Sequence, residues 1–108
     1  MQRVAIPVFG DRISNRLDCS ENVLLVSIEN GQVIKRDTCH LAEIDSFSKL
    51  GLLANLGIDV LICNGITEFF ENRLSDRHIQ IIPWISGEAE TILEQYLQGT
   101  LLTEKPSR

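Results

Sequence analysis

The stretch VLLVSIENGQVIKRD, residues 23–37, decides the fold of this chain. It contains two runs of strand-forming residues, Val23–Ile28 and Gln32–Asp37, with Asn30-Gly31 in the turn between them. Asn-Gly between two such runs is the strongest short-range signal for a β-hairpin, because both residues readily adopt a positive φ. Upstream, Val4–Phe9 is apolar on both faces, which predicts a buried strand that precedes the hairpin.

Downstream of the hairpin, helical and strand patterns alternate. Phe47, Leu50, Leu53 and Ala54 recur at helical spacing, which predicts a helix that buries these side chains. The order β-β-β-α-β-α-β-α predicts a three-layer α/β fold, in which a five-stranded mixed sheet carries helices on both faces. The remaining predicted elements are a strand over Asp59–Cys63, a helix over Glu68–Leu74, a strand over Ile79–Trp84 and a helix over Glu88–Leu97.

Length and charge restrict the classes of function. The chain has 108 residues, 44% of them hydrophobic, so we expect a single domain over residues 1–100 and a flexible tail over 101–108. No apolar run approaches the roughly 18 residues that cross a bilayer, so no membrane association is expected. The net charge of −5 argues against nucleic-acid binding. Three cysteines without a disulfide pattern favour reduced thiols in the cytoplasm.

The carboxyl ends of three predicted strands should share one edge of the sheet. If the first, fourth and fifth strands are parallel and joined by right-handed crossovers, residues 10–16, 63–67 and 84–88 meet there. Ligands of open α/β sheets favour this edge, because helix N-termini present free N–H groups at it. The topology therefore predicts where a binding site lies.

The same three segments carry a family resemblance. AIPVFGDRIS (5–14), LICNGI (61–66) and IPWISG (82–87) together resemble the dinitrogenase iron–molybdenum cofactor biosynthesis family, in the right order over nearly the whole chain. The resemblance implies a ribonuclease-H-like fold. It also implies a non-catalytic protein that carries an iron–sulfur or molybdenum-containing cluster or its precursor, with a cluster donor or acceptor protein as its partner.

One position departs from the family. Nitrogenase accessory members carry a histidine implicated in cofactor binding in the turn after the first strand, and the matching residue here is Arg16. An arginine stays protonated, so it has no lone pair with which to ligate a metal. It can still hold an anionic cluster by charge and hydrogen bonds.

Two kinds of residue at the predicted edge are candidates for binding. Thiolates are preferred ligands of iron–sulfur clusters, which makes Cys19 and Cys63 the candidate metal ligands. The alternative interpretations are a solvated loop around residues 10–18, ordinary helix capping after the later strands, and a packed core thiol for Cys63. Guanidinium, hydroxyl, amide and backbone N–H groups for an anion come from Gly10, Asp11, Arg12, Ser14, Arg16, Asn64, Gly65, Thr67, Ser86 and Gly87.

The leading hypothesis is therefore a cluster carrier without catalytic residues, as a monomer or small homo-oligomer. The alternative is a ligand-free interaction or regulatory module that binds a partner through the edge of the third or fifth strand. A nuclease of ribonuclease-H type needs several carboxylates around paired Mg²⁺ ions. Val4–Phe9 has no acidic residue, and Asp59 stands at the wrong end of its strand.

Overall fold

The computed structural model describes residues 1–41, 44–99 and 101. Of the predicted tail over 101–108, only Leu101 is described, so the rest of that prediction lies outside the described residues. In chain order the elements are β1 (Gln2–Phe9), β2 (Arg12–Ile13), the short 3₁₀ helix η1 (Leu17–Cys19), β3 (Asn22–Glu29), β4 (Gln32–His40), α1 (Ser46–Ala54), β5 (Val60–Ile62), α2 (Glu68–Ser75), β6 (Gln80–Ile82) and α3 (Ala89–Gln98).

The strands form one mixed sheet in the order β4-β3-β1-β5-β6. The predicted hairpin is present, because β3 and β4 pair antiparallel around Asn30 and Gly31, which both have a positive φ. On its two sides β1 pairs antiparallel with β3 and parallel with β5, and β5 pairs parallel with β6. The carboxyl ends of β1, β5 and β6 therefore share one edge, as predicted.

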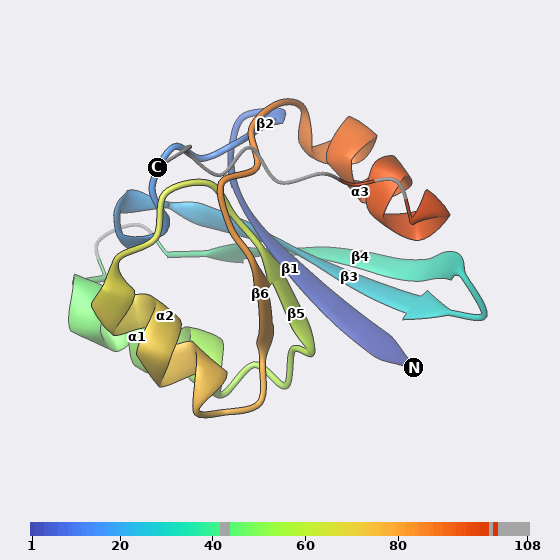
Figure 1. The fold of residues 1–108 in the computed structure, drawn as a ribbon. Helices are drawn as coiled ribbons and strands as arrows, with labels where there is room; N and C mark the ends of the chain where they lie inside the picture. Colours follow the sequence, from blue (N-terminus) through green and yellow to red (C-terminus); the bar gives the residue numbers. More distant parts are fainter. Residues whose placement is uncertain (42–43, 100, 102–108) are drawn as a thin grey trace, which may run out of the picture.

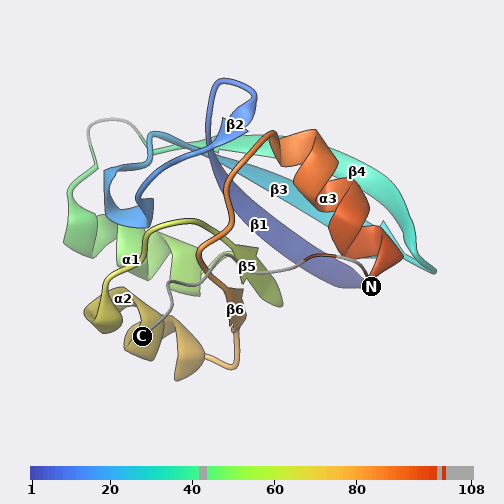
Figure 2. The ribbon, with the colours of Figure 1, turned by 45° about the horizontal axis from the view of Figure 1, so that its top comes forward.

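Helices cover both faces of the sheet and complete the predicted three-layer α/β architecture (Figures 1 and 2). α1 and α2 lie on one face, and α3 lies on the other. In β5, Leu61 packs in the core beneath α1 and α2, whereas Val60 and Ile62 pack in the core beneath α3. A strand that is buried on both faces reads as a continuous apolar run, which explains the pattern of this segment.

The sheet has six strands rather than the five predicted. The additional strand, β2, folds back on the end of β1, with Val8 opposite Ile13 and Phe9 opposite Arg12. Two residues are too few to produce a period-2 pattern, so no pattern in the sequence predicts this strand. This small hairpin begins the loop that lies over the carboxyl edge of the sheet.

One residue of α1 departs from the predicted helical pattern. Asp45 caps the helix by accepting the backbone N–H of Ser48 at 2.9 Å, which also holds the pKa of its carboxyl below the usual value. Leu53 is wholly buried as predicted, but Phe47 is 74% exposed. Phe47 lies in the first turn and contacts the ring of Phe69 in α2, with the centroids 5.7 Å apart.

No helix within residues 1–41, 44–99 and 101 is long and apolar enough to cross a membrane.

Candidate functional site

Three loops meet at the carboxyl edge of the parallel strands. They are residues 10–19 after β1, 63–67 after β5 and 83–88 after β6. Both ribbon views place them side by side beyond the strand ends (Figures 1 and 2). We call the first loop the site loop (residues 10–19). Its backbone forms hydrogen bonds with the second loop and with the segment where the third loop enters α3.

Gly65 is the point where the site loop meets the second loop. Its N–H donates to the carbonyl oxygen of Asn15 at 2.8 Å, and its own carbonyl accepts the N–H of Leu17 at 2.8 Å. A Cβ added at Gly65 would lie 2.7 Å from the Asn15 carbonyl oxygen, closer than real Cβ contacts come. Glycine is therefore required here by the close approach of two backbones.

A second pair of hydrogen bonds joins the site loop to the start of α3. The N–H of Ile13 donates to the carbonyl of Gly87 at 2.9 Å, and the N–H of Ala89 donates to the carbonyl of Asp11 at 2.8 Å. Backbone hydrogen bonds thus hold the site loop in place. The side chains of Arg12, Asn15, Arg16 and Cys19 are left exposed to solvent.

A hollow of about 410 Å³ opens within the site loop. Arg12, Asn15, Arg16 and Cys19 are exposed residues of its lining, so two arginines, one asparagine and one cysteine border the same space. Such a set of donors suits a multivalent anion with soft sulfur or metal atoms. The lining consists of Phe9, Arg12, Ile13, Ser14, Asn15, Arg16 and Cys19.

Asp18 orients one of the two guanidinium groups. Its carboxylate accepts Nε and Nη2 of Arg16 at 3.1 and 2.9 Å, a bidentate arrangement. The Arg16 side chain nevertheless stays 59% exposed. Behind the loop, the buried Lys49 of α1 donates through Nζ to the carbonyl of Asp18 at 3.3 Å. A third positive charge therefore lies beneath the site loop.

The predicted anion-binding residues divide into two groups. Arg12, Ser14, Arg16 and the predicted metal ligand Cys19 come together in the hollow. Phe9, Ile13 and Asn15 also line it and are not among the predicted binding residues, although Asn15 belongs to the polar turn over residues 10–18. The others are at the same edge but outside the lining: Gly10, Asp11, Asn64, Gly65, Thr67, Ser86 and Gly87.

Several residues outside the lining have structural roles. The Thr67 hydroxyl caps α2 by accepting the N–H of Phe70 at 3.2 Å. The carbonyl of Asn64 accepts the N–H of Trp84 at 3.1 Å, which joins the second and third loops. Trp84 itself lies beyond β6, which ends at Ile82 rather than at the predicted Trp84. The Thr67 contact agrees with the capping alternative for the loop after β5, whereas Glu88 at the start of α3 makes no side-chain cap.

Cys63 does not reach the hollow. Its side chain is wholly buried in the core beneath α1 and α2. Burial, with a smaller contribution from the charge of Glu71, raises the pKa of the Cys63 thiol to about 12. A thiol that stays protonated and enclosed favours the packing interpretation over ligation.

The described residues do not form a conventional chelating site. Within them, no three His, Cys, Asp or Glu side chains gather closely enough to hold a metal ion. A bare divalent cation is therefore a poor fit to this edge.

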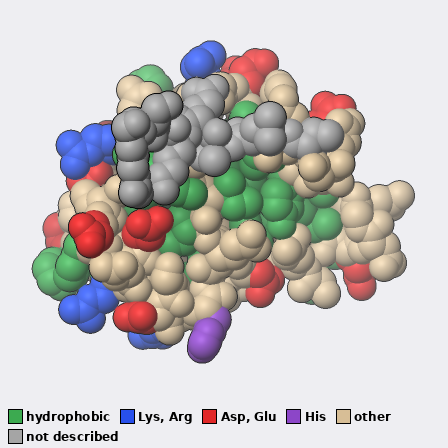
Figure 3. Space-filling model, in the orientation of Figure 1, with side chains coloured by type: hydrophobic (Ala, Val, Ile, Leu, Met, Phe, Trp, Pro, Cys, Tyr) green, Lys and Arg blue, Asp and Glu red, His purple; other side chains and the backbone are tan. Residues whose placement is uncertain are grey.

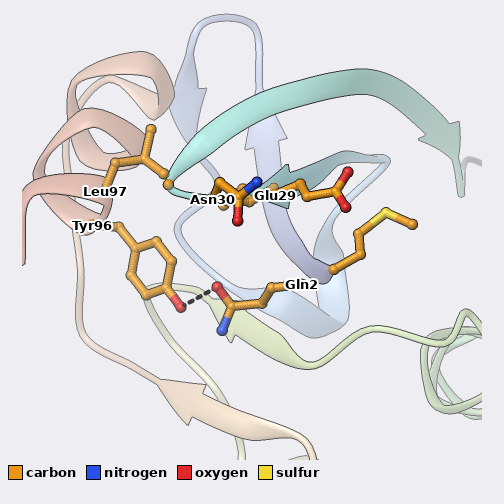
Figure 4. A pocket seen from close by; sticks show the side chains of 8 residues that line it. Gln2, Glu29, Asn30, Tyr96 and Leu97 are labelled. Atoms are coloured by element: carbon orange, nitrogen blue, oxygen red, sulfur yellow. Dashed lines mark hydrogen bonds between the residues drawn. The ribbon is translucent and has the colours of Figure 1, made fainter.

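A larger hollow, of about 650 Å³, lies at the opposite end of the sheet (Figure 4). There α3 meets the start of β1, and Tyr96 donates through its hydroxyl to Oε1 of Gln2 at 3.0 Å. None of the described residues that line it is Arg, Lys, His or Cys. Its described side chains offer neither the guanidinium nor the thiol groups of the smaller hollow, so we place the candidate site at the site loop.

Comparison with known proteins gives a consistent result. The sequence model of the family described as "Dinitrogenase iron-molybdenum cofactor" matches residues 1–99. No curated protein matches the chain.

Solved structures share the fold. The protein PH0822 is 18% identical, with 95% of each chain covered and a TM-score of 0.89. The protein MJ0327 of Methanocaldococcus jannaschii is 22% identical, with 96% of each chain covered and a TM-score of 0.79. The apo form of the orange protein of Desulfovibrio gigas is 15% identical, with 100% of this chain and 98% of that chain covered and a TM-score of 0.76.

Proposed function

Because the chain belongs to the dinitrogenase iron–molybdenum cofactor family, we propose that it is a non-catalytic carrier of an anionic metal–sulfur cluster or its precursor. The cargo is an iron–sulfur or molybdenum-containing species, bound in the hollow of the site loop. The single observation that carries the proposal is the convergence of Arg12, Arg16 and Cys19 on that hollow. A cluster donor or acceptor protein is the implied partner.

Charge supports an anionic cargo. The chain as a whole has a net charge of −5, yet two guanidinium groups line the hollow and Lys49 lies behind it. Guanidinium groups present several N–H donors in a plane, which suits the sulfide and oxide atoms at the surface of a cluster. The two hydrogen bonds that Arg16 donates to Asp18 fix the plane of its guanidinium, so less side-chain entropy is lost when the cargo binds.

The thiol supports a cargo that contains metal. Cys19 is the exposed cysteine of the three, and its thiolate can replace one terminal ligand of a cluster. Structural iron–sulfur sites use four cysteines, whereas this hollow offers one. A single covalent ligand with charge-assisted hydrogen bonds gives a hold that can be reversed, which suits a protein that receives a cargo and passes it on.

Anaerobic reconstitution tests the proposal. The protein is incubated with iron and sulfide, with and without molybdate, desalted, and examined by metal analysis and ultraviolet–visible spectroscopy. We expect stoichiometric metal with sulfur-to-metal absorption. Cys19→Ser should reduce retention most, and Arg12→Gln or Arg16→Gln should make retention more sensitive to salt.

Two variants serve as matched controls for this experiment. Cys39→Ser removes a half-buried thiol outside the hollow, and Lys35→Gln removes an exposed charge on β4. Both should retain metal like the parent chain. A folded parent that retains no metal, or retention that is unchanged in all three site variants, would contradict the proposal.

A further inference from the structure

A third hollow, of about 290 Å³, lies between α1 and α2. Both ribbon views show these helices side by side on one face of the sheet (Figures 1 and 2). We call this hollow the α1–α2 groove. Its lining includes Phe47, Gly51 and Ala54 from α1 and Phe69, Arg73 and Arg77 from α2 and the turn after it. The site loop described above uses none of these residues.

Two aromatic rings stand exposed at one end of the groove. Phe47 is 74% exposed and Phe69 is 43% exposed, although they contact each other. The guanidinium of Arg73 lies over the Phe69 ring, 5.1 Å from its centroid. Figure 3 shows hydrophobic, basic and acidic side chains interspersed over these helices. Covering an exposed aromatic cluster of this kind with another surface lowers the free energy, because apolar area is removed from water.

Gly51 makes the groove accessible to a backbone or a bulky side chain. It lies inside α1, where glycine costs roughly 0.5–1 kcal/mol relative to alanine. A Cβ added at Gly51 would meet nothing within 4 Å, so no packing within the described chain demands the glycine. Its φ is not in the left-handed region either. The space above Gly51 is therefore open to a partner.

We propose that the α1–α2 groove binds an amphipathic α-helix of a partner protein. The apolar face of that helix would cover Phe47 and Phe69 and approach α1 closely over Gly51. Acidic side chains beside its apolar face would pair with Arg73 and Arg77. Within the lining, the two cations outnumber the one carboxylate, that of Asp76, so the local charge favours acidic side chains on the partner.

The groove is also physically connected to the site loop. α1 packs on η1, and Lys49 in the second turn of α1 donates to the carbonyl of Asp18. A partner helix bound near Phe47 would therefore contact α1, which supports the site loop. The inference itself does not require the cargo, because the protein without cargo already presents the groove.

Two synthetic peptides test the proposal. Each is an amphipathic helix with a leucine face, flanked by glutamates in one and by lysines in the other. Titration of the ¹⁵N-labelled full chain, without cargo, is followed by amide chemical shifts and by fluorescence anisotropy of the labelled peptide. We expect the glutamate peptide to shift amides of residues 47–54 and 69–77, with an affinity about tenfold above that of the lysine peptide.

Variants of the chain distinguish binding in the groove from non-specific binding of the peptides. Gly51→Phe fills the groove from a position with free space around it and should abolish binding. The Arg73→Gln/Arg77→Gln variant should remove the preference for the glutamate peptide, whereas Lys35→Gln should change nothing. Absence of binding, equal binding of both peptides, or shifts outside the two helices would overturn the proposal. Self-association of the chain through residues 47–54 and 69–77, seen by analytical ultracentrifugation, would overturn it in favour of a second copy.

Each outcome remains separate from the carrier proposal. Metal retention is measured without peptide, and peptide binding is measured without metal. A chain that retains metal and ignores the peptides would leave the carrier proposal intact and overturn only the docking proposal.

Discussion

The site loop (residues 10–19) and the loop after β5 (residues 63–67) lie against each other, but they differ in how far their side chains are exposed to solvent. The site loop turns its side chains outward, with Arg16 and Cys19 exposed. The loop after β5 turns inward: Cys63 is wholly buried, Thr67 caps α2, and Gly65 presents only backbone. Two hydrogen bonds between Gly65 and the site loop join them.

This difference separates stability from binding. Backbone hydrogen bonds and buried anchors such as Leu17 hold the site loop in place. The polar side chains of the hollow therefore contribute little to folding and can be chosen for a ligand. Substitutions in the inward loop and at the anchors should cost stability, whereas substitutions of exposed side chains in the site loop should change binding alone.

The two cysteines at this edge give the sharpest contrast. At pH 8, iodoacetamide should modify Cys19 rapidly, because its thiol is exposed. Cys63 should react on the order of a thousandfold more slowly, since its buried thiol becomes accessible only when the core opens. Mass spectrometry of the labelled peptides over time measures both rates. Similar rates in the folded chain would show that the edge is open and would remove the distinction between the loops.

The raised pKa of Cys63 also predicts a pH dependence of stability. The folded-state pKa is about 12, against an ordinary value of 9.0, so above pH 9 the unfolded chain loses this proton first. The stabilisation is fully present below pH 9 and is lost as the pH rises from about 9 to about 12. The free energy of unfolding, measured with urea, should therefore fall over this pH range more steeply for the parent chain than for Cys63→Ala. If stability falls with pH equally in both chains, the raised pKa of Cys63 is contradicted.

The buried anchor of the site loop should give the largest loss among its residues. Leu17 is 1% exposed and packs in the core beneath α1 and α2. Leu17→Ala should lower the free energy of unfolding by about 2–5 kcal/mol, because it leaves a cavity. Asn15→Ala, which truncates an exposed neighbour, should stay within about 0.5 kcal/mol of the parent. Urea denaturation distinguishes the two, and equal effects would show that the loop has no anchor.

The contact at Gly65 should give an intermediate effect. Gly65→Ala places a Cβ 2.7 Å from the carbonyl oxygen of Asn15, so the two backbones must separate. We expect a loss of about 1–3 kcal/mol, with amide shifts at residues 15–17. Gly51→Ala is the matched control, because its Cβ has free space inside a helix, and it should stabilise by about 0.5–1 kcal/mol. A neutral Gly65→Ala would show that the loops are not tightly joined.

Much of the fold could be predicted because its signals are local. The Asn-Gly turn, the apolar runs and the helical spacing fixed the order of elements, and parallel pairing then placed the candidate site at one edge. Phe47 departs from the expectation because helical spacing alone does not tell at which residue of α1 the buried face begins. Only the tertiary structure shows that Phe47 lies beyond the core.

The site was harder to predict because it depends on contacts between distant segments. The pairing of Gly65 with Asn15 and Leu17 has no counterpart in a local pattern. For Cys63, however, the sequence held a usable signal. Side chains alternate along a strand, so Cys63 must share the face of the buried Leu61, which predicts packing rather than ligation. Phe9 gave no comparable signal, because an apolar residue at a strand end usually packs.

The smallest stability effect, and the one that best tests the separation of roles, is expected at Arg16. Its bond to Asp18 is exposed to solvent, and such pairs contribute little to folding. Arg16→Gln should therefore change the free energy of unfolding by no more than about 0.5 kcal/mol. If the same variant retains less metal as salt is raised while its urea curve overlays that of the parent, binding and stability are separable at this residue. A loss of several kcal/mol would instead make Arg16 part of the scaffold, and its effect on metal retention would then report folding rather than contact with the cargo.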